Sequence, residues 1–250
     1  MSEPFIYPKK TIWLYLRSSL LFILVLSVTV MITPFMLLAA LLPYQWHFKL
    51  ARFWGQGVLL MAKWVCGIDY EISGLEHLQA QKNAIVLCKH QSAWETIALV
   101  ALLPPQAILL KKSLLLIPFW GWAMASLKPI AIDRSSPKKA LKQLLSQGAE
   151  RLQAGFWVVI YPEGTRMSPN EHGKFSASGS LLAQRTGYPI IPIAHNAGEC
   201  WPRNSFVKYA GCIQLKIGAP IRVDGRKSKV INEEAEGWIK HTMQTISLQK

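Results

Sequence analysis

The chain has 250 residues, with 28 Lys and Arg against 14 Asp and Glu, and 51% of its residues are hydrophobic. The resulting formal charge of +14 favours anionic partners, and the hydrophobic content favours lipid over nucleic acid, which we do not expect as a partner. The four cysteines show no paired spacing and the histidines no metal-ligand pattern, so neither a disulfide framework nor a metal site is predicted.

The first predicted element is the uncharged stretch of residues 18–42, which would be about 37 Å long as a straight helix and could enter a bilayer. Its length disfavours a cleaved signal peptide. Basic residues flank it on both sides, so the positive-inside rule selects no orientation for a single-pass helix. Pro34 lies in the middle, where it would break or kink a helix, and slightly favours a hairpin that enters one leaflet and returns.

We therefore expect residues 1–65 to form a membrane-associated helical segment, and residues 66–250 to form an α/β domain. A mixed sheet flanked by helices is predicted, because short apolar runs alternate with helical segments. The expected location is the cytoplasmic face of a bacterial-type inner membrane. Predicted strands cover residues 69–73, 84–88, 107–110, 129–132, 157–160, 188–194 and 214–217; predicted helices cover 96–103, 178–186, a segment from Pro137 to Gly155, and a closing helix capped by Asn232.

Two segments of this domain have more than one interpretation. Residues 111–122 are too short and interrupted to span a membrane, and fit either ordinary core or the wall of an acyl-chain groove or membrane-facing rim. Pro192 falls inside the predicted strand of residues 188–194. Proline cannot donate to a ladder, so this strand should lie at a sheet edge or carry a bulge.

His90 and Glu95 stand at a junction between a predicted strand and a predicted helix. Five residues turn a helix by about 140°, so His90 must precede the helix if the two side chains are to meet. One interpretation is structural: Ser92 caps the helix and Glu95 closes a capping box. The other is catalytic: His90 deprotonates a hydroxyl while Glu95 holds the imidazole tautomer. The spacing alone leaves both open.

A second polar segment, residues 161–166, follows the predicted strand of residues 157–160. Gly164 allows a tight turn whose backbone can approach a ligand, and Arg166 can hold an oxyanion with two hydrogen bonds. A plain turn with a surface salt bridge is the alternative interpretation.

Four blocks in this order resemble the glycerolipid acyltransferase family, specifically the 1-acyl-sn-glycerol-3-phosphate acyltransferases. The first resembles the family's histidine, four residues and aspartate, with Glu95 in place of the aspartate. The remaining blocks are Ile130-Ala131-Ile132-Asp133-Arg134, preceded by residues 111–122 in the family style; Tyr161-Pro162-Glu163-Gly164-Thr165-Arg166; and Ile190-Ile191-Pro192-Ile193-Ala194.

The resemblance implies a glycerol-3-phosphate acyltransferase-like fold and the synthesis of phosphatidic acid from an acyl thioester of coenzyme A or acyl carrier protein, with no further cofactor. It implies that His90 is the general base, assisted by Glu95. Trp120 and Pro192 are expected to have acyl-pocket or structural roles. The implied acceptor site comprises Arg134, Glu163, Gly164, Thr165 and Arg166.

Two departures from the family pattern leave the acceptor open. Glu95 adds a methylene to the family's aspartate, and residues 174–179 lack the lysines usually found before the last glycine of that segment. The alternatives are a different lysolipid, such as a lyso-aminolipid or another lysophospholipid, and a catalytically inactive membrane lipid-binding module. Oligomeric state is not predicted.

Overall fold

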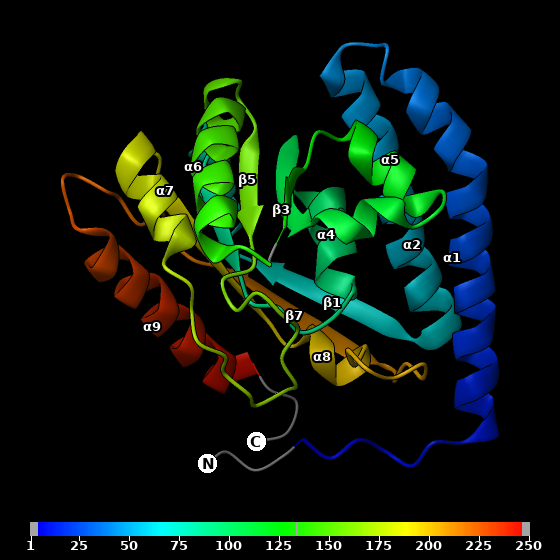
Figure 1. Ribbon diagram of the computed structural model, residues 1–250. Coiled ribbons are helices and arrows are strands. Elements are labelled where there is room, and N and C mark those ends of the chain that lie inside the picture. The colour runs from blue at the N-terminus through cyan, green and yellow to red at the C-terminus, as the bar shows by residue number, and fades with distance from the viewer. Residues whose placement is uncertain (1–4, 134, 247–250) are drawn as a thin grey trace.

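The computed structural model describes residues 5–133 and 135–246, and within them a seven-stranded sheet has the order β1-β7-β6-β2-β5-β3-β4 (Figure 1). Neighbouring strands are parallel except for β6 and β7, so the predicted mixed sheet is confirmed. The strands are β1 (Ile68–Ser73), β2 (Ile85–Cys88), β3 (Gln106–Lys111), β4 (Ile130–Ile132), β5 (Trp157–Ile160), β6 (Ile190–His195) and β7 (Gly211–Ile217).

Helices cover both faces of the sheet, which is why β2 and β5 are buried along their whole length. Val86 of β2 packs into the core on the side of α2 and α4, whereas Leu87 packs into the core on the side of α6, α7 and α9. The helical segments are α1 (Ile12–Ala39), α2 (Tyr44–Cys66), α3 (Leu75–Gln79), α4 (Trp94–Leu102), the 3-10 helix η1 (Lys112–Leu116), α5 (Trp120–Ser126), α6 (Pro137–Gln153), α7 (Ser178–Thr186), α8 (Ala197–Cys200) and α9 (Ser228–Ile246).

The amino-terminal apolar stretch forms part of one helix, α1, and does not reverse at Pro34 as expected. The chain turns after Ala39, and α2 then packs along α1 (Figure 1). Packing against α2 over many turns offsets the single helical hydrogen bond that Pro34 removes. By length and composition α1 could cross a membrane, and only 22% of its most apolar window is buried by the protein. The boundary between residues 65 and 66 remains a prediction.

Pro192 lies in an interior strand, so the expected edge position is wrong, and the irregularity lies in the chain that pairs with β6 and not in β6 itself. Ile193 pairs with Ile217, and Ile190 bridges to Ile221. The chain after β7 therefore carries one residue more than β6 between these two pairings, which defines a bulge opposite Pro192. Gly218 N–H donates to the Pro192 carbonyl over 2.8 Å within the bulge.

The closing helix begins earlier than its apolar pattern predicted, and Asn232 is not its cap. Ser228 is the first residue of α9, and its N–H donates to the Gln184 side-chain oxygen over 3.3 Å. Asn232 lies one turn inside the helix, where its Oδ1 accepts a hydrogen bond from Ser180 Oγ over 3.0 Å. Its polar side chain therefore joins α9 to α7 instead of starting a helix.

Candidate active site

The candidate site lies at the sheet edge where the parallel strands β2, β5, β3 and β4 have their carboxyl ends. His90 follows β2 and precedes α4, and residues 161–177 follow β5. Met167 N–H donates to the His90 carbonyl over 2.8 Å. This bond fixes the segment after β5 beside His90.

Glu95 contacts His90 as the catalytic interpretation predicts. Nδ1 of His90 lies 2.8 Å from Oε1 of Glu95, and the same oxygen accepts the backbone N–H groups of Gln91 and Ser92, each over 2.9 Å. An ionised carboxylate only accepts hydrogen bonds, so the ring hydrogen resides on Nδ1. Nε2 of His90 is then left with the lone pair that a general base requires.

The capping interpretation is correct in part. Glu95 accepts the Ser92 N–H, as in a capping box, but Ala93 occupies the N-cap position of α4. The hydroxyl of Ser92 accepts from Trp94 N–H over 3.0 Å, one residue too early for a capping box. One glutamate thus starts the helix and orients the histidine at the same time.

Glu95 is completely buried, and its environment keeps it charged. Burial by itself would raise the pKa of this carboxyl. The hydrogen bonds that the carboxylate accepts from His90 and from the Ser92 N–H outweigh burial and hold the pKa of Glu95 below its ordinary value. A negative charge is therefore in place to stabilise an imidazolium at His90.

Glu163, expected in the acceptor site, lies beneath the site instead. Its completely buried carboxylate forms an ion pair with the equally buried Lys89. Its oxygens also accept the N–H groups of His90 over 3.0 Å and of Gly173 over 3.2 Å. Lys89 Nζ additionally donates to the Glu171 carbonyl over 2.9 Å. These protein groups occupy the Glu163 carboxylate, so its role is to hold the backbone under His90.

The other residues of the predicted acceptor site have different placements. Gly164 adopts φ +68°, which confirms the tight turn, and Thr165 next to it is exposed. Arg166 lines the same pocket as His90. None of the ion pairs among the described residues involves Arg166, so the alternative of a surface salt bridge does not apply there. Arg134 lies outside the described residues, directly after Asp133.

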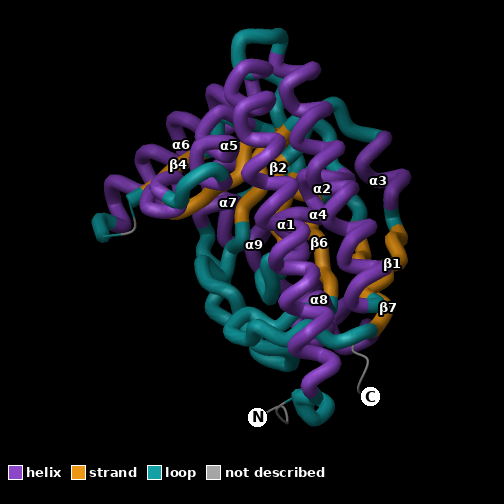
Figure 2. Tube along the Cα trace, turned by 90° about the vertical axis from the view of Figure 1, so that its right-hand side faces the viewer, coloured by secondary structure: helices purple, strands orange, loops and turns teal. Residues whose placement is uncertain are grey.

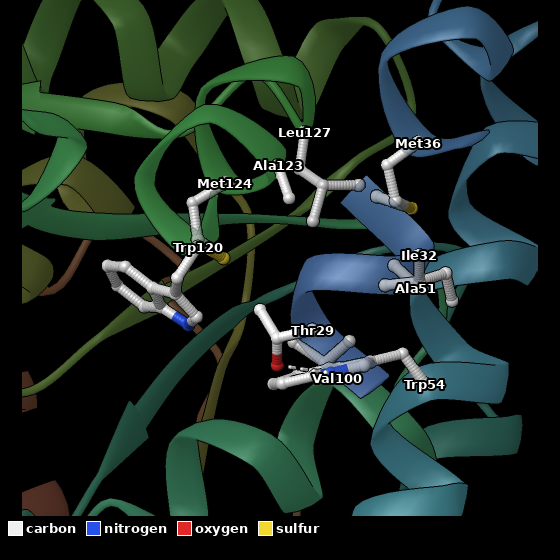
Figure 3. A pocket seen from close by; sticks show the side chains of 10 residues that line it. All are labelled: Thr29, Ile32, Met36, Ala51, Trp54, Val100, Trp120, Ala123, Met124 and Leu127. Atoms are coloured by element: carbon white, nitrogen blue, oxygen red, sulfur yellow. Dashed lines mark hydrogen bonds between the residues drawn. The ribbon is translucent and has the colours of Figure 1, made fainter. Parts of the chain in front are cut away.

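A mostly apolar pocket opens beside His90 and Arg166. Trp120 lines this pocket and also a second pocket with an apolar surface (Figure 3). The second cavity lies between α1, α2, α4 and α5, where Trp54 Nε1 donates to Thr29 Oγ1 over 3.0 Å. The two cavities share four lining residues, Trp54, Val100, Trp120 and Met124. Pro192 lines neither of them and is structural.

Two residues of this site were not identified from the sequence. The Tyr161 ring stacks on the His90 imidazole, with centroids 4.2 Å apart. Buried His195 donates from Nε2 to the Lys89 carbonyl over 2.8 Å and accepts the Ala197 N–H at Nδ1 over 3.2 Å. Burial lowers the pKa of His195, which keeps its ring neutral. Tyr161 lies inside the third block of the resemblance, whereas no spacing pattern identifies His195.

The arrangement combines a base with a fixed tautomer, a cation able to bind an oxyanion, and apolar space for a hydrocarbon chain. Among the described residues, no group of three or more His, Cys, Asp or Glu side chains could hold a metal ion.

The family model described as "Acyltransferase" matches residues 69–196. The chain belongs to this acyltransferase family. A Pseudomonas aeruginosa relative named 1-acyl-sn-glycerol-3-phosphate acyltransferase is 44% identical over 92% of this chain and 91% of its own. A Saccharomyces cerevisiae relative with the same name is 32% identical over 70% of this chain and 58% of its own.

A solved structure of another acyltransferase has the same fold as this chain. The crystal structure of the Thermotoga maritima 1-acyl-sn-glycerophosphate (LPA) acyltransferase, PlsC, aligns with a TM-score of 0.79 and 20% sequence identity. The alignment covers 92% of this chain and 94% of the Thermotoga chain, so the likeness extends to α1 and α2 as well as the sheet.

Proposed function

We propose that the protein transfers a fatty acyl group from an acyl thioester to the free hydroxyl of 1-acyl-sn-glycerol-3-phosphate, giving phosphatidic acid. The observation that carries the proposal is the 2.8 Å contact of His90 Nδ1 with Glu95, where His90 lines a pocket that Arg166 also lines. The 44% identity to a relative of that name supports the choice of acceptor.

The chemistry needs one base and no covalent enzyme intermediate. His90 Nε2 takes the proton of the acceptor hydroxyl as that oxygen attacks the thioester carbonyl. The tetrahedral intermediate then expels the thiolate, which recovers the proton from the imidazolium. Glu95 stabilises the imidazolium between the two steps. A positioned base contributes about 10² to 10⁴ in rate, and holding hydroxyl and thioester together supplies much of the remainder.

Arg166, together with Arg134, is proposed to bind the acceptor phosphate, because a guanidinium matches the geometry of phosphate oxygens. Gly164 and Thr165 would shape that site. The two neighbouring apolar pockets, which share Trp120 as a lining residue, are proposed to hold acyl chains. The donor is proposed to be a coenzyme A or carrier-protein thioester, with no metal and no other cofactor.

The proposed location is the cytoplasmic face of a bacterial-type inner membrane, with α1 in contact with lipid and the sheet domain in the cytoplasm. The outward side chains of α1 include Trp13, Leu20, Met31 and Phe35, all exposed in the protein and suited to hydrocarbon or the bilayer interface. Membrane lipids then hold the protein through α1, and the membrane also contains the acceptor.

The test uses membranes from cells overproducing the wild type, His90→Ala, or His77→Ala as a matched control on the half-exposed helix α3. Each is supplied with labelled acyl-CoA and a panel of lysolipids that includes lysophosphatidic acid and a lyso-aminolipid. Wild type and His77→Ala should form phosphatidic acid, and His90→Ala should form almost none.

Product formed only from a different lysolipid would change the identity of the acceptor and leave the proposed mechanism intact. Equal product from wild type and His90→Ala would contradict the role of the base. Absence of product with both acyl-CoA and acylated carrier protein as donors would favour the inactive lipid-binding module. The fixed tautomer of His90 argues against that alternative, because a protein that only binds lipid needs no general base.

A further inference from the structure

The segment of residues 111–122, between β3 and α5, presents apolar side chains to the outside. No residue of η1 is buried, so the interpretation of this segment as ordinary core is wrong. Leu116 is 79% and Ile117 is 44% exposed. We call the exposed apolar side chains of this segment the apolar rim: Leu114, Leu116, Ile117, Phe119 and Trp122.

The backbone that carries the apolar rim is held in one conformation by local contacts. Gly121 N–H donates to the Ile117 carbonyl over 2.8 Å, and a Cβ at Gly121 would lie 2.5 Å from the Leu115 carbonyl oxygen. Phe119 is held at φ 59°, a left-handed conformation that costs energy in a residue with a side chain. Its ring packs 5.2 Å from that of Trp122. A contiguous apolar surface held in place this way indicates a partner.

The inner side of the same segment forms the wall of the reaction pocket. Leu114 and Trp120 line the pocket that contains His90. Leu116 and Ile117 line neither cavity. The segment thus lies between the reaction pocket and the outside: Trp120 lines the pocket, Leu116 and Ile117 are exposed, and Leu114 borders both.

The surroundings of the apolar rim identify the partner as a bilayer. Helix α5 packs against α1, and Figures 1 and 2 place the two side by side in both views. On α1, Met31 and Phe35 are themselves exposed. At the start of the rim, Lys111 and Lys112 are exposed and suit anionic headgroups. A bilayer that covers α1 therefore meets the apolar rim at the same level.

We propose that the apolar rim inserts into the leaflet that α1 contacts, and that it forms the entrance through which the lysolipid acceptor passes from the bilayer to His90. The inference rests on the proposed function, since it concerns how that acceptor arrives. An acceptor with a long chain then never has to cross water. A short-chain acceptor dissolved in water does not need the rim.

The test compares two acceptors with the full-length protein reconstituted in vesicles of phosphatidylcholine and phosphatidylglycerol. One acceptor is 1-oleoyl-sn-glycerol-3-phosphate embedded in the vesicles, and the other is the water-soluble 1-hexanoyl analogue below its micellar concentration. Leu116→Glu/Ile117→Glu should lower kcat/KM for the embedded acceptor at least about tenfold, because charge disfavours insertion, and should leave the soluble acceptor within about twofold.

Two control variants sharpen the comparison. Val230→Glu places the same charge on an exposed apolar site of α9, on the other face of the sheet, and should affect neither acceptor. Leu116→Phe/Ile117→Phe keeps the rim apolar and should retain wild-type rates with both acceptors, since the rim acts through its hydrophobicity.

Equal losses with both acceptors in the glutamate variant would overturn the inference, because they would indicate damage to the reaction pocket. Unchanged rates with both would overturn it as well, since the rim would then have no part in acceptor delivery. If the wild-type protein acylates neither acceptor, the proposed function is contradicted, and this inference, which rests on it, is contradicted too.

Discussion

Glu95 and His90 meet through a single carboxylate oxygen, Oε1, which also accepts the N–H groups of Gln91 and Ser92. The other oxygen, Oε2, is buried without a hydrogen bond and lies 4.0 Å from Nε2 of His195. Glutamate has one methylene more than the family's aspartate. Here its Oε1 still reaches His90 while it accepts backbone N–H groups just before α4.

The charge of Glu95 should matter more than its length. Glu95→Gln removes the anion that stabilises the imidazolium and should lower kcat by about 10² or more. Glu95→Asp keeps the charge and should be less impaired. Steady-state rates of both variants at saturating substrates measure the difference. Wild-type rates in both would leave Glu95 with only its role at the helix start.

Arg166 should act on acceptor affinity more than on turnover. Removing a guanidinium that binds the phosphate in ground and transition states alike raises KM and spares kcat. Arg166→Ala should therefore raise KM for lysophosphatidic acid about tenfold or more, and KM for the acyl donor much less. Initial-rate measurements with each substrate varied in turn separate the two. Arg185→Ala, on α7, is the matched control, and an unchanged acceptor KM in Arg166→Ala would remove Arg166 from the phosphate site.

The buried pair of Lys89 and Glu163 should be needed as a unit. Lys89→Met leaves the Glu163 charge buried and unpaired, and should lower the free energy of unfolding by about 3–5 kcal/mol. Lys89→Met combined with Glu163→Gln should recover part of this loss, because no uncompensated charge remains. Denaturant unfolding of the purified variants measures both. Additive losses in the double variant would show that the pair is not coupled.

His195 should make stability depend on pH in a defined direction. Its pKa is 6.5 in the unfolded reference and lower in the folded protein, because burial disfavours the charged ring. As the pH falls below 6.5, the unfolded chain binds a proton that the folded chain excludes, so stability is lost until the pH reaches the lower folded pKa.

The thermal unfolding midpoint should therefore fall between pH 7.5 and 5.5, and fall less in His195→Gln, whose amide can retain a hydrogen bond to the Lys89 carbonyl. His241→Gln serves as the control, since His241 lies on the exposed side of α9. The same pH dependence in wild type and His195→Gln would contradict a neutral buried imidazole.

The sequence by itself determined most of the strands, the catalytic pairing and the family. Seven predicted strands match β1 to β7 within a few residues. The pattern is clearest in β2, β5 and β6, which are short apolar runs buried along their whole length. The spacing of His90 and Glu95 at a strand-to-helix junction allowed their contact but left a capping role open, and the four blocks of the resemblance favoured the catalytic pairing.

Only the tertiary structure decided what depends on residues distant in the chain. The pairing of Lys89 with Glu163, 74 positions apart, turned an expected ligand residue into a buried support. The packing of α1 on α2 kept the helix continuous through Pro34. Exposure of the apolar rim was likewise undetermined, because an apolar run reads the same whether its partner is a protein core or a membrane. Sequence periodicity records which side chains avoid water, and the fold decides what they contact instead.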